Sequence, residues 1–266
     1  MIERGDESDM SGRIDSKERA GSWAVSVYSY LRDTKVKIRQ SSPVRVGGGK
    51  RGKVTGFSEG SRRNLMFLFR NTEGRFPVWI DLTYPGEYPS DGEVSKRHLR
   101  AFLAFLKRRG IDDIWKLEFQ ERGAPHYHLV VSKCVEYYEI QKVWDRIIGN
   151  DWKARGEKHS SSTSVGAIKS VAQLYYRVQK YFTKRDQTDV PLGYENVGRF
   201  WGCSRGLLRP DVRSKVGSYY YVCALTRMFR RWLSARAKFR FRKKWTWRGF
   251  GFTAYDGALF RNSLRR

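Results

Sequence analysis

The spacing of apolar positions along the chain predicts alternating short strands and amphipathic helices. Apolar residues dominate 76–84 and stop at Pro85 and Gly86, which indicates a buried strand. Leucine and phenylalanine then recur at helical spacing, with Lys and Arg between them, until Gly110. The same reasoning predicts helices at 94–109, 135–148 and 171–184, with a polar loop at 149–164.

Two of the four histidines, His126 and His128, stand one residue apart in an apolar stretch. Alternate side chains of a β-strand share a face, so both imidazoles would point one way and Tyr127 the other. Two imidazoles side by side suggest a metal site. A pair of surface histidines on an ordinary hairpin is the simpler alternative.

A predicted hairpin adds oxygen ligands to this pair. Apolar runs at 115–119 and 129–131 flank a turn at 121–125, so the histidines would return beside the strand that carries Glu118 and Gln120. Three ligands from two strands would leave coordination positions open for water or substrate, as in catalytic metal sites.

The charge of the chain indicates its partner. With 53 Lys and Arg against 27 Asp and Glu, the formal net charge is +26, which favours a polyanion or an anionic membrane surface. No run of about 18 apolar residues exists, and the charged N-terminus lacks a signal peptide, so we expect no membrane partner. Nucleic acid is therefore the favoured partner. Three widely spaced cysteines fit a reducing cytoplasm, here that of a host cell.

The chain divides by pattern into three stretches. Residues 1–60 are polar and glycine-rich with little periodicity, and we interpret them as a flexible basic segment. The stretch 47–54 nearly forms a phosphate-binding loop, but Val54 stands where Ser or Thr would reach magnesium, so we expect no helicase motor. Residues 61–210 form the predicted catalytic domain, and 211–266 a basic, aromatic-rich extension.

The extension mixes aromatic and basic residues, a composition suited to unpaired bases, which stack on rings while cations follow phosphates. An edge strand that completes the sheet explains the same alternation equally well. The candidate DNA-binding residues are Arg240, Arg242, Lys243, Lys244 and Trp245.

The helix at 171–184 carries Tyr181 and Lys184, which are three residues apart and so are neighbours on one face. Alone, this pair fits the polar edge of an amphipathic helix. It gains interest because a metal motif precedes it.

Three motifs in this order resemble a known family. They are Asp-Leu-Thr-Tyr at 81–84, Leu-Glu-Phe-Gln-Glu-Arg-Gly-Ala-Pro-His-Tyr-His-Leu at 117–129, and Lys-Tyr-Phe-Thr-Lys at 180–184. A later segment, Gly-Arg-Phe-Trp-Gly-Cys-Ser-Arg-Gly-Leu at 198–207, adds to the likeness. The chain resembles the rolling-circle replication initiators of the HUH endonuclease superfamily, of the filamentous-phage and plasmid type, over residues 76–208.

The resemblance implies an α+β fold: a central antiparallel sheet, ferredoxin- or RRM-like, with packed helices and with basic N- and C-terminal extensions. It implies that His126, His128 and Glu118 hold a divalent cation, Mg²⁺ or Mn²⁺, with Gln120 as an additional candidate. Two imidazoles favour Mn²⁺ or a later metal, and such a set would also bind zinc.

By the same resemblance, Tyr181 is the nucleophile and Lys184 assists it. The protein would cut single-stranded DNA at a replication origin, form a 5′-phosphotyrosine and leave a 3′-hydroxyl that primes a polymerase. Strand separation would come from supercoiling or a partner such as a host helicase. Some relatives have a second tyrosine four residues before the first, but that position is Arg177 here. Tyr176 lies five residues away and well round an α-helix, so we expect one nucleophile.

Two alternatives keep part of this pattern. A basic protein that binds single-stranded nucleic acid without catalysis predicts Tyr181 far from the histidines or buried against the sheet. A cupin-type or other metal-dependent hydrolase acting on a small molecule would need further histidines, and only His98 and His159 remain. The origin sequence and the oligomeric state are open.

Overall fold

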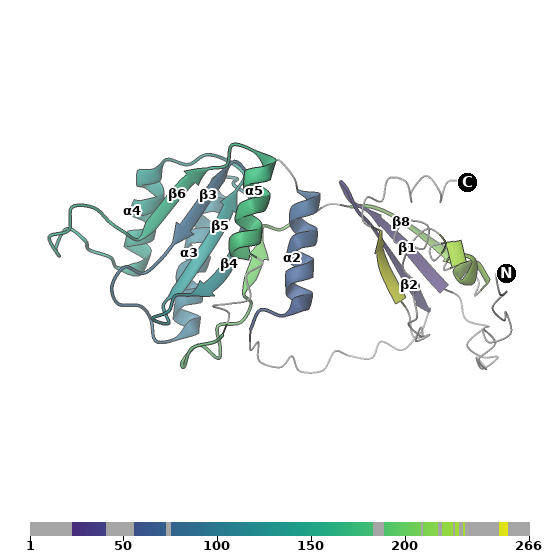
Figure 1. The fold of residues 1–266 in the computed structure, drawn as a ribbon, viewed down its shortest axis with the longest axis horizontal. Helices are drawn as coiled ribbons and strands as arrows, with labels where there is room; N and C mark the ends of the chain where they lie inside the picture. Colours follow the sequence, from purple (N-terminus) through teal and green to yellow (C-terminus); the bar gives the residue numbers. More distant parts are fainter. Residues whose placement is uncertain are drawn as a thin grey trace, which may run out of the picture. The chain divides into compact units, whose positions relative to one another are not determined.

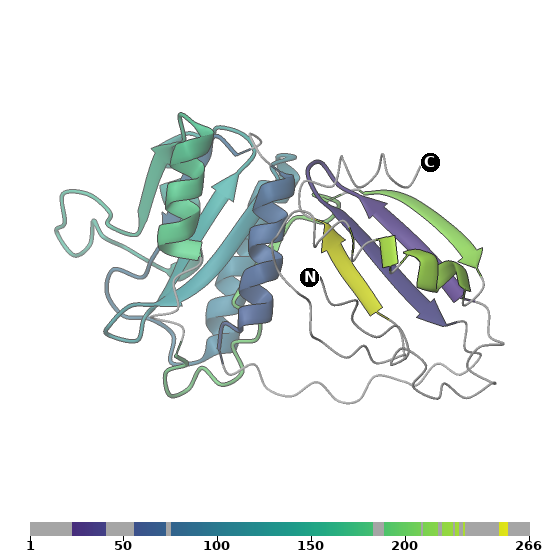
Figure 2. The ribbon, with the colours of Figure 1, turned by 45° about the vertical axis from the view of Figure 1, so that its right-hand side comes forward.

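The computed structural model describes residues 23–40, 56–72, 76–182, 189–208, 210–217, 220–225, 227–228, 231 and 250–254. The chain forms two compact units, one of residues 49–208 and one that combines 1–48 with 209–266 (Figures 1 and 2). Each unit has its own sheet. In the described part of the chain, no helix is both long and apolar enough to cross a membrane.

The unit of residues 49–208 is built on a five-stranded antiparallel sheet with the order β6-β3-β5-β4-β7. Its strands are β3 (Val78–Leu82), β4 (Asp113–Phe119), β5 (Pro125–Val131), β6 (Thr163–Ala167) and β7 (Trp201–Cys203). Helices pack on both faces (Figure 1). The predicted α+β class with a central antiparallel sheet is confirmed.

One face of this sheet packs on α3 (Gly92–Arg108) and α4 (Tyr137–Ile148). The helix predicted at 94–109 is thus confirmed. It begins where the side chain of Asp91 accepts a hydrogen bond from the backbone N–H of Glu93, a typical N-cap. Inward residues of alternate strand positions meet the helices in one apolar core, which includes Ile80, Leu82, Leu117, Tyr127, Leu129, Phe102, Leu106 and Trp144.

The opposite face is covered by α2 (Glu59–Asn71), α5 (Val171–Arg177) and a π-helical segment, η2 (Val178–Phe182). The apolar residues that join this layer to the sheet are Leu65, Leu68, Phe69, Trp79, Ile114, Val130, Leu174, Val178 and Phe182. The helix predicted at 171–184 therefore begins as expected but widens from an α-turn to a π-turn before Tyr181. Residues 183–188 lie outside the described part of the chain.

The predicted hairpin is confirmed by the pairing of β4 with β5. The turn that joins these strands includes Gly123, whose positive φ of 83° suits a residue without a Cβ. Glu118 pairs directly with His126 across the two strands. Because register fixes which side chains share a face, this pairing decides the composition of the site.

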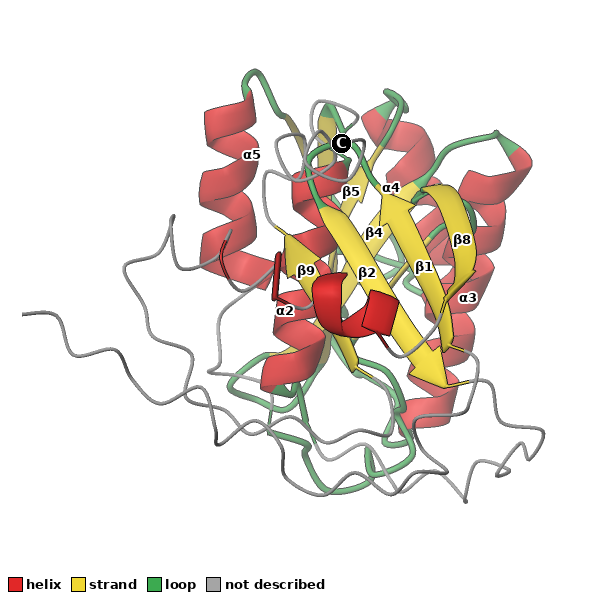
Figure 3. Ribbon diagram, turned by 90° about the vertical axis from the view of Figure 1, so that its right-hand side faces the viewer, coloured by secondary structure: helices red, strands yellow, loops and turns green. Residues whose placement is uncertain are grey.

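The unit of residues 1–48 and 209–266 has a four-stranded antiparallel sheet with the order β8-β1-β2-β9 (Figure 3). Its strands are β1 (Trp23–Ser29), β2 (Thr34–Gln40), β8 (Asp211–Gly217) and β9 (Phe250–Ala254). Helical residues 220–225 lie across one face. They close a small core that contains Trp23, Val25, Val36, Ile38, Val222 and Leu225.

Two strands lie within residues 1–60, where the sequence analysis found little periodicity and expected a flexible segment. That expectation was wrong for 23–40, because β1 and β2 alternate buried and open positions over only seven residues each. Their flanking partners, β8 and β9, come from beyond residue 210, so local pattern alone could not reveal the sheet. The proposed domain boundaries at residues 60 and 210 stay a prediction, and 47–54 lie outside the described residues.

Candidate functional site

The register of three strands brings titratable side chains together on the face that carries α2 and α5. His126 and His128 lie on the central strand β5, and Tyr127 between them is fully buried on the other face, as predicted. On one side of β5, Asp81 of β3 pairs with His128. On the other side, Glu118 of β4 pairs with His126. The site is therefore built from sheet positions rather than from loops.

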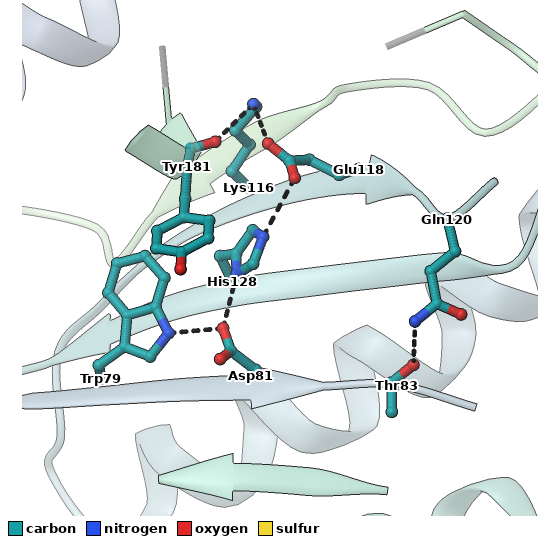
Figure 4. A network of polar contacts seen from close by, with 8 residues as sticks. All are labelled: Trp79, Asp81, Thr83, Lys116, Glu118, Gln120, His128 and Tyr181. Atoms are coloured by element: carbon teal, nitrogen blue, oxygen red, sulfur yellow. Dashed lines mark hydrogen bonds and ion pairs between the residues drawn. The ribbon is translucent and has the colours of Figure 1, made fainter. Parts of the chain in front are cut away.

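His128 lies between two carboxylates (Figure 4). Its Nδ1 is 2.5 Å from Oδ1 of Asp81, and its Nε2 is 3.1 Å from Oε2 of Glu118. Burial alone would lower the pKa of His128, but the hydrogen bonds to Asp81 and Glu118 outweigh it and raise that pKa above its usual value. Trp79 Nε1 also donates to Asp81 Oδ1 at 2.5 Å, which fixes this carboxylate.

His126 has a different environment, although its ring centroid is only 4.5 Å from that of His128. Its buried Nδ1 has no hydrogen-bond partner among the described residues. Burial, followed by the charge of His128, lowers the pKa of His126 to about 4. The imidazole is therefore neutral at neutral pH, and neutral imidazole is the form that binds metals.

Ligand atoms of Asp81, His126 and His128 all lie within 4.8 Å of one another, a grouping that could hold a metal ion. The unpartnered nitrogen of His126 and the mixture of two nitrogens with one carboxylate oxygen fit a divalent cation. Binding at His128 would require that residue to give up one of its two carboxylate contacts.

The sequence analysis did not assign Asp81 to the site. A signal was present, because Asp81 is an isolated charge within the apolar strand Val78–Leu82. Only the pairing of β3 with β5, however, shows that it faces the histidines. Glu118, which was assigned as a ligand, stays a prediction.

Glu118 makes a second contact, with a lysine that is buried in the same layer. Lys116 Nζ donates to Glu118 Oε1 at 2.6 Å, and Lys116 is fully buried. Burial would raise the pKa of Glu118, but the hydrogen bond to His128 and the charge of Lys116 hold it below its usual value. Glu118 is therefore a carboxylate at neutral pH.

Tyr181 lies beside the histidines. Its ring centroid is 4.9 Å from that of His128 and 5.3 Å from that of Trp79, and the side chain is half-buried. Figure 4 shows the ring standing over the sheet between these two neighbours. Lys116 Nζ donates to its backbone carbonyl at 2.7 Å. The π-turn that contains Tyr181 is typical of helices at functional positions.

A lysine that the sequence analysis did not assign is next to the tyrosine. Lys180 Nζ lies 5.1 Å from the ring centroid of Tyr181. A hydrogen bond to Tyr181 raises the pKa of Lys180, which is therefore a cation at neutral pH. Lys184, the lysine expected to assist, lies outside the described residues.

The remaining assigned residues are dispersed. Gln120 faces the site, but its Nε2 donates to Oγ1 of Thr83 at 3.1 Å. Tyr176 is 62% exposed, and the argument that it lies well round the helix assumed α-geometry, whereas η2 is a π-helix. The DNA-binding candidates Arg240, Arg242, Lys243, Lys244 and Trp245 lie outside the described residues.

These groups line an open cavity of about 280 Å³. Its lining residues are Glu118, Phe119, Gln120, His126, His128, Lys180 and Tyr181. Imidazoles, a carboxylate, a cation and a phenol thus share one solvent-accessible hollow. This combination suits an anionic substrate that approaches both a metal and a nucleophile.

Comparison with known proteins points to DNA replication. Residues 77–186, which include every residue of the cavity, match the family of the replication-associated protein ORF2. The chain is thus similar to a class of replication-associated proteins over the region that forms the site.

A particular relative agrees with this class. The chain is 26% identical over 189 residues to a protein of Xylella fastidiosa (strain 9a5c) that is named as a candidate replication protein. The alignment covers 67% of this chain and 65% of the relative, so the chain spans just under two thirds of that protein. No solved structure matches the chain significantly.

Proposed function

We propose that this protein is a metal-dependent, sequence-specific single-stranded DNA endonuclease and strand transferase of the HUH type. It nicks a replication origin, forms a 5′-phosphotyrosine and so initiates rolling-circle replication. Tyr181 is the nucleophile. Asp81, His126 and His128 are the candidate metal ligands, with Glu118 as a further ligand or as a partner of His128.

The observation that carries this proposal is the closeness of Tyr181 to the histidines. The ring of Tyr181 lies 4.9 Å from that of His128, and both residues line the same open cavity. A phosphate that enters this cavity would meet the phenol and the candidate metal ligands together. Proximity of this kind converts attack on a phosphodiester into an intramolecular step.

The covalent step exchanges one phosphate ester for another. The phenolic oxygen of Tyr181 bonds to phosphorus as its proton leaves, and the bond from phosphorus to the 3′-oxygen breaks. The 3′-oxygen takes up a proton and becomes a free hydroxyl. Since the new bond is also a phosphate ester, the enzyme can reverse the step and rejoin strands.

Two lysines prepare the tyrosine for this step. Lys180 places a cation beside the phenol, and a nearby cation favours the phenolate over the phenol. Lys116 binds the backbone carbonyl of Tyr181 and so fixes the π-turn relative to β4. A metal held by Asp81, His126 and His128 would supply positive charge that offsets the negative charge of the phosphate.

The metal that the site prefers follows from its donors. Phosphate chemistry commonly uses Mg²⁺, whereas two imidazoles favour Mn²⁺ or a later metal. We therefore propose Mn²⁺ or Mg²⁺ as cofactor, with the higher affinity for Mn²⁺. Single-stranded origin DNA is the proposed substrate, in the cytoplasm of a host cell, and a host helicase and polymerase are the proposed partners.

A non-catalytic protein that binds single-stranded nucleic acid is the second candidate. It fits the net charge of +26. It also predicts that Tyr181 lies far from the histidines or is buried against the sheet. The half-exposed position of Tyr181 beside His128 favours the nicking enzyme instead.

The test uses labelled single-stranded oligonucleotides from the origin region of the source replicon, incubated with the full chain and Mn²⁺ or Mg²⁺. A DNA–protein adduct that survives denaturation is expected, and it should disappear in Tyr181→Phe and in His126→Ala. Tyr176→Phe is the matched control and should retain the adduct. Binding without an adduct on any strand would support the non-catalytic protein.

A further inference from the structure

The four-stranded sheet of residues 1–48 and 209–266 has two unlike faces. The face with Trp23, Val25, Val36 and Ile38 packs against helical residues 220–225. The other face, here called the open face, is set by the register of β1 with β2 and β8. Its described side chains are those of Ala24, Ser26, Tyr28, Lys35, Lys37, Val212, Ser214 and Val216.

Solvent reaches the open face in the described part of the chain. Val216 is 69% exposed and Val212 is 49% exposed, whereas Val25 and Val36 on the opposite face are each 2% exposed. Lys37 is also exposed. Only Ser26 and Ser214, which are hydrogen-bonded to each other at 2.9 Å, occupy the middle of this face. Their small side chains would let a partner approach the sheet closely.

The charge of the open face has one sign. Its described side chains include two lysines and no Asp or Glu. Burial and the neighbouring charge of Lys37 lower the pKa of Lys35, so the two cations repel each other and would gain from a shared anion. Residues 209–266, which belong to the same unit, contain 16 Lys and Arg against two Asp.

The single aromatic ring among the described open-face residues is already in contact with a cation. Lys37 Nζ lies over Tyr28 at 4.8 Å from the ring centroid. The face therefore lacks the row of free rings on which unpaired bases stack. Its small central hydroxyls and flanking lysines instead suit a double helix, where cations bind phosphates and short polar side chains reach base edges.

We propose that the open face binds duplex DNA. This surface is separate from the nicking site proposed above, and the proposal does not depend on the nicking activity. Lys35 and Lys37 would bind the phosphate backbone, and Ser26 and Ser214 would lie against the groove. A protein with both surfaces could hold the duplex that borders a single-stranded target.

The test compares two exposed cations on opposite faces of one sheet. Lys37→Ala removes a charge from the open face. Arg213→Ala removes a charge from the helix-covered face, where Arg213 pairs with Val27 in register and is 71% exposed. Binding of a fluorescent duplex to the full chain is measured by anisotropy over a series of salt concentrations.

We expect Lys37→Ala to weaken duplex binding about fivefold and to reduce the salt slope by about one, and Arg213→Ala to leave both nearly unchanged. Equal effects of the two variants would overturn the proposal. So would a loss confined to single-stranded DNA. Val216→Lys adds a cation to the open face and should tighten duplex binding and steepen the salt slope; no gain from it would also overturn the proposal.

Nicking of a short single-stranded oligonucleotide separates this proposal from the preceding one. Lys37→Ala should nick such a substrate as the unmodified protein does. Nicking that needs Tyr181, with duplex binding insensitive to Lys37, would leave the nicking enzyme intact and remove the open face. Duplex binding that needs Lys37, without nicking by any variant, would do the reverse. Circular dichroism of each variant checks the fold.

Discussion

Lys116 donates a hydrogen bond from Nζ to the backbone carbonyl of Tyr181 at 2.7 Å, across 65 positions of sequence. The same ammonium binds the carboxylate of Glu118 at 2.6 Å. One buried cation thus joins the strand that carries Glu118 to the π-turn that carries the proposed nucleophile. The position of the phenol over the sheet is therefore coupled to a buried ion pair.

The buried pair gives a stability prediction. Lys116→Met would leave the Glu118 carboxylate in the core with only His128 as its partner, so we expect the free energy of unfolding to fall by about 2 kcal/mol. Lys116→Met combined with Glu118→Gln removes both charges and should lose less. Urea denaturation of the three proteins measures this. A double variant less stable than Lys116→Met would contradict the explanation.

Local pattern predicted the parts of the fold in which neighbouring residues decide the structure. The helix at 94–109 and the hairpin of β4 and β5 depend on spacing and on a turn within one short stretch, and both are confirmed. The strands β1 and β8 were not predicted, because each needs a partner that lies far along the chain.

The same distinction applies to the candidate site. The shared face of His126 and His128 followed from strand alternation, since only neighbouring residues determine it. Asp81 reaches these residues through the pairing of β3 with β5, a contact across 47 positions. The π-turn at Tyr181 was also missed, because helical spacing does not distinguish a π-turn from an α-turn over five residues.

Metal affinity distinguishes the two candidate carboxylate ligands. Asp81→Ala should weaken Mn²⁺ binding on the order of 100-fold, because it removes an oxygen from the grouping of Asp81, His126 and His128. Glu118→Gln keeps the shape of the side chain and should cost less if Glu118 acts mainly through His128. Titration calorimetry with Mn²⁺ measures both. The opposite order would make Glu118 the ligand.

The cation beside the nucleophile gives a kinetic prediction. Lys180→Ala should lower the rate of adduct formation on the order of tenfold, since the phenolate of Tyr181 would lose its neighbouring charge. Lys180→Arg keeps the charge and should retain most of the rate. Single-turnover nicking of a labelled oligonucleotide measures this, with DNA affinity checked separately. An arginine variant as slow as the alanine variant would show that charge is not the cause.

Asp113 gives a prediction about pH. It is 6% exposed, and burial raises the pKa of its carboxyl to about 6, although Ser204 Oγ donates to it at 2.7 Å. Because the folded protein holds this proton more tightly than the unfolded chain, the stabilisation is present below pH 4 and is lost as the pH rises through 6. Asp113→Asn removes the buried charge, so it should raise the free energy of unfolding at pH 7.5 by on the order of 2 kcal/mol relative to the unmodified protein, and that advantage should vanish near pH 4. Denaturation at both pH values measures it, with the exposed Asp112→Asn as control. An advantage for Asp113→Asn that stayed constant between the two pH values would exclude the carboxyl as its source.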